Sequence, residues 1–232
     1  MKLPPLVEGR LIRRYKRFLA DVELSGGRVV TAHCPNSGSM KGCAHPGGRV
    51  WLSHSNNPSR KLAYTWELAE VGGFMIGLNT GLPNKLVHEA IENGTIDELQ
   101  GYSSIRPEVP YGERSRIDLL LEGPAGRCYV EVKNVTLVDD GRALFPDAVT
   151  TRGQKHLYEL MRVVREGDRG VIFFTVQRGD GNSVSPADAI DPEYGRLLRL
   201  AVANGVEALA YRADISVEEI RLTEHLPVRI EN

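Results

Sequence analysis

Apolar and polar residues alternate over the first third of the chain. Apolar side chains occupy every second position from Phe18 to Leu24, and Gly26 and Gly27 follow as a hairpin turn. Further short segments typical of β-strands, separated by turns or loops, lie at residues 28–33, 49–52, 61–71 and 74–78. Five or so short strands with glycine turns predict a small barrel of the OB type over residues 1–80.

The pattern changes after Thr80 and Gly81, which we take as the junction between two domains. Apolar residues at helical spacing predict helices at about residues 82–92, 152–165 and 192–204. Strands are predicted at residues 104–109, 117–121, 127–133, 170–176 and 206–211, and a long polar connection is predicted at residues 134–146. The order helix, three strands, helix, strand, helix, strand predicts an α/β (α+β) domain over residues 81–232.

The hairpin predicted at the centre of this second domain carries the candidate chemistry. Its strands flank a turn that contains Gly123, Pro124 and Gly126. Because successive side chains of a strand point to opposite faces, Glu131 and Lys133 share one face. A suitable register places Asp118 of the first strand beside Glu131, so that two carboxylates and an ammonium group converge on one patch.

Such a cluster suits metal-dependent hydrolysis of phosphodiesters. Two nearby carboxylates repel each other, and a hard cation between them relieves the repulsion. Asp118 and Glu131 would hold Mg²⁺ or Mn²⁺, with the Val132 carbonyl as a further ligand. Lys133 would orient or activate the attacking water, which makes Lys133, Glu131 and Asp118 the predicted catalytic residues. The alternative is an ordinary solvated ion pair, because Glu-x-Lys is common on strands.

A third carboxylate is predicted from the helix at residues 82–92. Glu89 and Glu92 both lie off the apolar stripe of this helix. Glu89 is better centred, so we predict it as a further metal ligand, with Glu92 left open. A plain surface glutamate is the alternative interpretation of both.

The overall charge predicts neither binding nor avoidance of nucleic acid, because 29 basic residues face 30 acidic ones. Any basic surface must therefore be local. Basic residues gather between Arg10 and Arg17, and Arg60 and Lys61 lie near two aromatic residues. This pattern on a barrel predicts a single-strand nucleic-acid surface, although charges also protect strand edges. The predicted contacts are Arg13, Arg14, Arg60 and Lys61.

Membrane insertion, secretion and a disulfide framework are not indicated. No apolar run is long enough to cross a bilayer, and the N-terminus lacks the apolar core of a signal peptide. The cysteines Cys34, Cys43 and Cys128 include no Cys-x-x-Cys pair, so neither disulfides nor a zinc site is favoured. We therefore expect a cytoplasmic protein with no membrane association, and the oligomeric state stays open.

The Asp…Glu-x-Lys set on a hairpin between two helices resembles the PD-(D/E)XK nuclease superfamily. The resemblance covers about residues 82–212, with Ile117 where many members have proline. It implies a nuclease-like mixed sheet flanked by helices. Gln154 and Tyr158 resemble the Gln-x-x-x-Tyr helix motif of one nuclease subgroup, which implies that Gln154 helps to position water or phosphate.

The whole chain more specifically resembles the SfsA, or sugar fermentation stimulation protein A, family. The segments that carry this resemblance are residues 36–40, 57–62, 79–84, 115–118, 129–133, 145–150, 152–157 and 206–211. The resemblance implies an N-terminal OB-fold domain, a C-terminal nuclease-like domain and DNA binding without marked sequence preference. The family name derives from a sugar-metabolism phenotype and suggests a regulatory role.

Together these features predict a DNA-binding protein with a metal-dependent nuclease site. One alternative is a DNA-binding regulator of sugar metabolism genes on a catalytically silent nuclease fold. Another is an enzyme for a small phosphorylated or sugar substrate, although neither a Walker-type loop nor paired sugar-hydrolase carboxylates are identifiable. The sequence does not decide between single- and double-stranded DNA, between DNA and RNA, or between internal and terminal cleavage.

Overall fold

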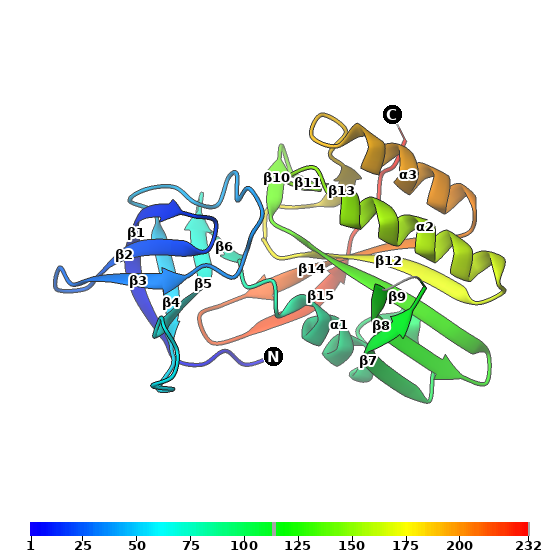
Figure 1. Ribbon diagram of the computed structural model, residues 1–232, viewed down its shortest axis with the longest axis horizontal. Helices are drawn as coiled ribbons and strands as arrows, with labels where there is room; N and C mark the ends of the chain where they lie inside the picture. The colour runs from blue at the N-terminus through cyan, green and yellow to red at the C-terminus, as the bar shows by residue number, and fades with distance from the viewer. Residues whose placement is uncertain (113–114, 232) are drawn as a thin grey trace.

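The computed structural model describes residues 1–112 and 115–231. Its ribbon forms two domains side by side, a barrel coloured blue to cyan and a larger domain coloured green to red (Figure 1). The predicted two-domain α+β architecture is therefore confirmed. The barrel's last strand ends at Gly77 and the first helix begins at Pro83, so the predicted junction at residues 80–81 falls in the connection between them.

The N-terminal domain is the predicted OB-type barrel. Its strands are β1 (Leu6–Tyr15), β2 (Leu19–Leu24), β3 (Val29–His33), β4 (Arg49–His54), β5 (Tyr64–Val71) and β6 (Phe74–Gly77). The sheet order is β3-β2-β1-β4-β5-β6, and an additional parallel pairing of β3 with β5 closes the barrel. Inward-facing side chains such as Val22, Leu52 and Trp66 fill its interior, as the alternating pattern predicts.

Strand β1 is absent from the sequence prediction, which treated its residues only as a basic cluster. Only Gly9 and Leu11 of this strand are buried, because most of its side chains face solvent. The alternation that identifies a half-buried strand is therefore weak here. Its pairing with both β2 and β4 makes it a strand all the same.

The C-terminal domain is built on a six-stranded mixed sheet in the order β15-β14-β12-β9-β8-β7. The strands are β7 (Ser104–Tyr111), β8 (Ser115–Gly123), β9 (Gly126–Val135), β12 (Arg169–Val176), β14 (Glu207–Ile215) and β15 (Ile220–His225). The pairs β9–β12 and β12–β14 are parallel, and the other pairs are antiparallel. The central strands are buried on both faces, as their apolar runs predict.

Helices cover both faces of this sheet. Helix α1 (Pro83–Glu92) and the short 3₁₀ helix η1 (Asp97–Leu99) pack against one face. Helices α2 (Thr151–Arg165) and α3 (Pro192–Ala203) lie together on the opposite face (Figure 1). Apart from the short η1, β10, β11 and β13, the element order from α1 to β14 is the predicted order of helix, three strands, helix, strand, helix, strand.

The predicted polar connection at residues 134–146 is wrong. It contains β10 (Leu137–Asp139) and β11 (Arg142–Phe145), which form a hairpin and pair with β13 (Ser183–Pro186) in a separate small sheet. These strands have only three or four residues each, too few for a periodic signal. Strand β15 was also missed, since four of its six residues are exposed at the sheet edge.

The two domains share one apolar core and several hydrogen bonds. Trp51 and Leu68 of the barrel pack in the same buried cluster as the apolar face of α1. The Gly77 N–H donates to the Gln177 carbonyl (2.9 Å), and the Met40 N–H donates to Asp147 Oδ2 (3.1 Å). The barrel therefore sits in a defined position against the sheet. No helix within the described residues is long and apolar enough to cross a membrane.

Candidate functional site

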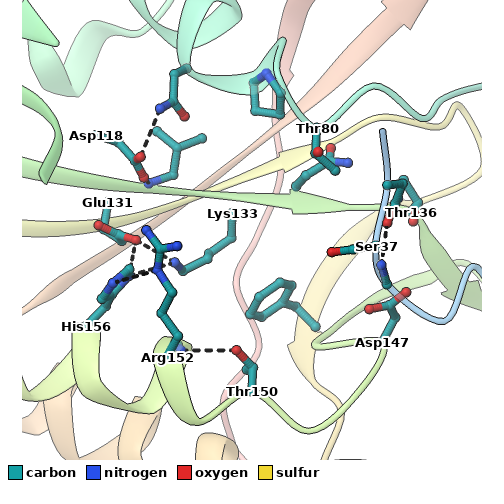
Figure 2. A pocket seen from close by; sticks show the side chains of 18 of the residues that line it. Ser37, Thr80, Asp118, Glu131, Lys133, Thr136, Asp147, Thr150, Arg152 and His156 are labelled. Carbon is teal, nitrogen blue, oxygen red and sulfur yellow. Dashed lines mark hydrogen bonds and ion pairs between the residues drawn. The ribbon is translucent and has the colours of Figure 1, made fainter. Parts of the chain in front are cut away.

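A cavity of about 440 Å³ lies where the two domains meet. The barrel side contributes Ser37 and Thr80, and α2 contributes Arg152 and His156 (Figure 2). The sheet contributes the predicted set of Asp118, Glu131 and Lys133. The structure thus brings the three residues of the central hairpin together in one cavity.

Asp118 is fixed where the pairing of β8 with β9 ends. The last paired residues are Leu119 and Val130. This is the register that the prediction from sequence required for Asp118 to lie beside Glu131. Beyond that pair, Asp118 Oδ2 accepts a hydrogen bond from the Val132 N–H (2.7 Å). Asp118 Oδ1 accepts one from Asn84 Nδ2 of α1 (2.8 Å). Each oxygen keeps a second lone pair for a further partner.

Glu131 is almost completely buried, with 2 % of its surface exposed. Its Oε1 atom contacts Lys133 Nζ (2.6 Å) and His156 Nδ1. Its Oε2 atom is buried and has no hydrogen-bond partner in the described part of the chain. Because a buried oxygen without a partner is costly, this atom is the strongest pointer to a ligand in the cavity.

His156 and Arg152 were not predicted, and both enter the cavity from the first turns of α2 (Figure 2). They are four residues apart and so share one face of the helix. Thr150 caps this helix by accepting the Gly153 N–H (3.1 Å). Arg152 Nε donates to His156 Nε2 (3.4 Å), which leaves Nδ1 to donate to Glu131 Oε1, and Lys133 Nζ also lies 3.2 Å from Nδ1. The sequence signal that could have identified them is a pair of cationic or polar residues four positions apart at the start of a predicted helix.

The two carboxylates have opposite pKa shifts. Burial, followed by the charge of Glu131, raises the pKa of Asp118, and Lys133 with the two hydrogen bonds offsets only part of this effect. Burial also acts to raise the pKa of Glu131, but Lys133 and His156 together outweigh it and lower that pKa. Glu131 is therefore stabilised as an anion in the folded protein, and Asp118 is the carboxylate that gains most from a nearby cation.

Gln154 does not line the cavity, contrary to the prediction. Its amide nitrogen donates to Asp191 Oδ1 (2.9 Å), and Asp191 caps α3 by accepting the Tyr194 N–H (3.0 Å). Tyr158, the other residue of the motif, is half exposed. At about 100° per residue, Gln154 lies on the side of α2 that faces α3 instead of the side with Arg152. Gln154 therefore joins two helices.

Glu89 also lies away from the cavity. Its Oε1 atom accepts a hydrogen bond from the amino group of Met1 (3.0 Å), and its side chain is 48 % exposed. Glu92 pairs with His88 on the exposed surface of α1 (3.5 Å). The residue of α1 that reaches Asp118 is Asn84, because only the first turn of the helix faces the cavity.

A third carboxylate of the cavity comes from β7 instead. Glu108 lines the cavity, and its Oε1 atom lies 3.4 Å from Asn84 Nδ2. Its backbone has a φ of 53°, an unusual value for a residue other than glycine. Within the described ranges no three His, Cys, Asp or Glu side chains are grouped closely enough to hold a metal ion by themselves. The pair Asp118 and Glu131 is thus the core of the acidic set.

None of the four predicted DNA contacts lines the cavity. Arg13 Nε pairs with Asp21 Oδ2 (2.8 Å), Arg60 donates to the Thr65 hydroxyl (2.9 Å), and Lys61 is exposed. Arg14 is partly buried and uses one nitrogen, Nη2, for three backbone carbonyls. Arg14 is therefore a support for backbone rather than a free surface cation.

The barrel reaches the cavity through the loop Asn36–Met40. Asp147 of the second domain accepts hydrogen bonds from the Met40 N–H (3.1 Å) and the Ser39 hydroxyl (3.2 Å). A Cβ atom at Gly38 would lie 2.6 Å from Asp147 Oδ2, so only glycine fits at this contact. This loop is consequently held as part of the cavity wall, and Ser37 lies within it (Figure 2).

Comparison with known proteins agrees with this architecture. A model of the SfsA N-terminal OB domain matches residues 12–78, and a model of the sugar fermentation stimulation protein RE domain matches residues 81–219. This chain belongs to the SfsA family. The family resemblance predicted from the motifs is therefore confirmed.

Several SfsA-family proteins are similar over nearly their whole length. The sugar fermentation stimulation protein homolog of Pelobacter propionicus is 77 % identical over 228 residues, covering 98 % of this chain and 99 % of that protein. The homolog of Geobacter metallireducens is 76 % identical over 230 residues, with the same coverage of 98 % and 99 %. The structure of Pyrococcus furiosus SfsA in complex with Ca²⁺ has a TM-score of 0.90 at 29 % identity, covering 99 % of this chain and 98 % of that one.

Proposed function

We propose that this SfsA-family chain is a cytoplasmic, DNA-binding phosphodiester hydrolase that uses Mg²⁺ or Mn²⁺ and has little sequence specificity. The observation that supports it most is the buried Glu131 carboxylate beside Asp118 and Lys133, with one oxygen left without a partner. A purely structural ion pair would leave no such atom, because buried polar groups are normally satisfied. A small-molecule reaction has no comparable support among the described residues.

The donor set fits a hard divalent cation. Asp118, Glu131 Oε2 and the Val132 carbonyl offer oxygen ligands only, which is the preference of Mg²⁺ and Mn²⁺. The raised pKa of Asp118 reflects a buried carboxylate that a positive charge would stabilise. The Ca²⁺ of the Pyrococcus furiosus SfsA structure supports a hard cation in this family. When bound, such an ion supplies charge stabilisation at the scissile phosphate and at the leaving oxygen.

Lys133 and Arg152 supply the positive charge of the chain itself. The Lys133 side chain is 11 % exposed and is held by Glu131, so its ammonium group is fixed where it can orient a water toward a phosphate. The Arg152 guanidinium has one partner in the described residues, His156, through Nε. Its two terminal nitrogens can therefore donate to a phosphate oxygen in the cavity.

His156 acts in this proposal as a positioning residue. Its Nδ1–H holds Glu131 Oε1, which leaves Oε2 for the cation. Arg152 in turn holds the opposite ring nitrogen. Partners of this kind, which orient a ligand without touching the ion, commonly affect activity nearly as much as the ligand does. Gln154 and Glu89 have no part in this mechanism, because both are engaged elsewhere.

The barrel supplies DNA affinity in this proposal. Three basic residues at its surface can contact phosphates: Arg13, Arg60 and Lys61. Arg14 is partly buried behind the backbone carbonyls that it binds and adds its charge from there. Such contacts carry little sequence information, which accounts for weak base preference.

The decisive experiment is cleavage of supercoiled plasmid and of labelled single strands with Mg²⁺, Mn²⁺ or EDTA. Wild type should cut only with metal, and both Glu131→Gln and Lys133→Ala should abolish cutting while DNA binding persists. Glu89→Gln is the matched control, since Glu89 is a carboxylate outside the cavity that keeps its hydrogen bond as glutamine. Equal activity of Glu131→Gln and wild type would refute the assignment.

A different outcome would favour the regulatory alternative. If no metal supports cutting, and binding weakens steeply as salt rises, the chain is a DNA-binding protein on a silent nuclease fold. The cavity would then be a remnant without catalytic use.

A further inference from the structure

The turn between β1 and β2 has an unusual backbone. Lys16 and Arg17 have φ values of 49° and 63°, and both are in the left-handed region that normally favours glycine or asparagine. Of the three other described non-glycine residues with positive φ, Met40 and Glu108 belong to the cavity wall or to the loop that forms it, whereas Asp140 lies in the turn between β10 and β11. Strain of this kind gathers at functional sites more often than elsewhere.

The side chains of this turn are exposed and chemically distinctive. Lys16 and Arg17 are exposed and form no ion pair with any carboxylate that the structure describes, unlike the neighbouring Arg13. Phe18 follows them and is 50 % exposed. Two uncompensated cations next to an accessible aromatic ring match what an unpaired nucleotide requires, which is charge for its phosphate and a flat apolar face for its base.

Arg60 extends this surface across the same end of the barrel. Leu19 pairs with His33, and His33 pairs with Thr65, whose hydroxyl accepts from Arg60. Two strand spacings, about 10 Å, therefore separate Leu19 from Thr65. Arg60 likewise has no described carboxylate partner. We call this surface the barrel-tip patch and define it as Lys16, Arg17, Phe18 and Arg60.

The barrel-tip patch is continuous with the cavity. Arg14 Nη2 donates to the carbonyls of Arg17, Asn36 and Gly38, each at 2.9 Å. The Cys34 N–H donates to the Phe18 carbonyl (2.7 Å). Residues 36–38 line the cavity itself. The strained turn and the cavity wall are thus joined by the Arg14 guanidinium group.

We propose that single-stranded DNA binds across the barrel-tip patch and runs along the Asn36–Gly38 loop into the cavity. Lys16, Arg17 and Arg60 contact successive phosphates, and one base stacks on Phe18. Bases in a duplex already stack on each other and do not offer a free face, so the exposed ring selects unpaired strands. This path rests on the proposed function, because it delivers a phosphodiester to Asp118 and Glu131.

The test measures binding separately from cleavage. A labelled oligo(dT) and a duplex of equal length are titrated with full-length protein in EDTA, where no cleavage occurs, over a range of salt concentrations. Lys16→Asn with Arg17→Gly removes two charges and also suits the left-handed backbone, so weaker binding cannot be ascribed to misfolding. We expect it to bind oligo(dT) at least about tenfold more weakly, with a shallower salt dependence.

Two further variants address the base contact and the position of the charge. Phe18→Ala should weaken oligo(dT) binding about tenfold and leave the duplex nearly unaffected, as expected for loss of one stacked base. Arg165→Ala is the matched control for Arg17→Ala, because Arg165 is exposed and has no described carboxylate partner. It lies at the C-terminal end of α2, about 20 Å along the helix from the end that lines the cavity. It should bind like wild type.

The outcomes separate this proposal from the previous one. Wild-type affinity in the Lys16→Asn/Arg17→Gly variant, or equal loss in Arg165→Ala, would overturn the barrel-tip patch even if metal-dependent cutting persists. Equal loss of single-strand and duplex binding in Phe18→Ala would overturn selection of unpaired bases. If wild type never cuts DNA but these variants lose oligo(dT) binding as expected, the nuclease proposal fails and the patch stands.

Discussion

Charged residues serve the cavity and the barrel-tip patch in opposite ways. In the cavity, Glu131 is buried and is held by Lys133 and His156 at hydrogen-bond distance. On the patch, Lys16 and Arg17 are exposed and have no described carboxylate partner. A buried cluster depends on geometry and resists screening by salt, whereas an exposed one acts through a field that salt weakens.

Because of this difference, mutations should be able to change catalysis and DNA affinity separately in this protein. Changes in the cavity should alter rates, metal response and pH dependence. Changes on the patch should alter binding and its salt dependence. The predictions below test that separation, beginning with the largest expected effect.

Divalent metal should stabilise the folded protein through Asp118. At a free metal concentration of 100 times the dissociation constant, the gain in the free energy of unfolding is about 2.7 kcal/mol. Asp118→Asn should abolish this gain, while Arg13→Ala should retain it. Thermal unfolding with Mg²⁺ and with EDTA measures the effect, and equal metal stabilisation of wild type and Asp118→Asn would contradict the site.

Without metal, Asp118→Asn and Glu131→Gln should change the stability of the protein in opposite directions. The pKa of Asp118 is raised in the folded state, so its contribution to stability is present below its unfolded pKa and is lost as pH rises through the folded value. Asp118→Asn should thus stabilise the metal-free protein at neutral pH. The pKa of Glu131 is lowered, so its contribution is present at neutral pH and is lost as pH falls. Glu131→Gln should destabilise. Urea unfolding in EDTA across the acidic range distinguishes the two signs.

His156→Ala should lower kcat about 10- to 100-fold with little change in KM, because it releases Glu131 without removing a DNA contact. His156→Asn places an amide N–H near the position of Nδ1 and should restore part of the rate. His88→Ala is the control, since the ion pair that His88 makes among the described residues is with Glu92 on the surface of α1. A change confined to KM would show that His156 binds DNA instead of positioning Glu131.

Replacing the strained turn should raise stability while lowering affinity. Lys16→Asn with Arg17→Gly should increase the free energy of unfolding by about 1–2 kcal/mol, because the new residues tolerate positive φ. Arg17→Ala keeps a Cβ atom and should leave stability nearly unchanged. Urea denaturation with a constant m-value checks both. A loss of stability in the double variant would mean that the turn is not strained.

Arg13→Ala should have the smallest effect. Arg13 itself is exposed, and its largely buried partner Asp21 keeps hydrogen bonds from Tyr15 and Thr31, so the unfolding midpoint should shift little. Its loss of oligo(dT) affinity should be smaller than that of Arg17→Ala, because Asp21 already balances the charge of Arg13. Parallel titrations of the two variants make the comparison, and a larger loss in Arg13→Ala would move the binding surface away from the turn.

The local pattern of apolar, polar and turn residues was enough to predict much of the fold. The alternation from Phe18 to Leu24 marks a barrel strand, and the hairpin around Gly126 places Asp118, Glu131 and Lys133 on adjacent strands. These features depend on the fixed period of a strand and on turn residues, which are local properties. Strand β1 and the small β10–β11–β13 sheet escaped prediction because their signals are weak or short.

The identity of the helical residues in the cavity depended on tertiary structure. Sequence favoured Glu89 and Gln154, but docking of α1 and α2 turns Asn84, Arg152 and His156 toward the sheet. A helix presents every side chain in turn, so only its packing against the sheet decides which of them face a site. The entry of residues 36–38 into the cavity depends on contact between two domains.

The sequence by itself thus determined most of the element types, the family and the acidic hairpin with its lysine. Tertiary structure decided which helix faces complete the cavity and that a barrel loop forms its wall. The physical reason is the range of the forces involved. Periodicity and turn chemistry act over a few residues, whereas helix rotation and domain contact are set by apolar burial between segments far apart in the chain.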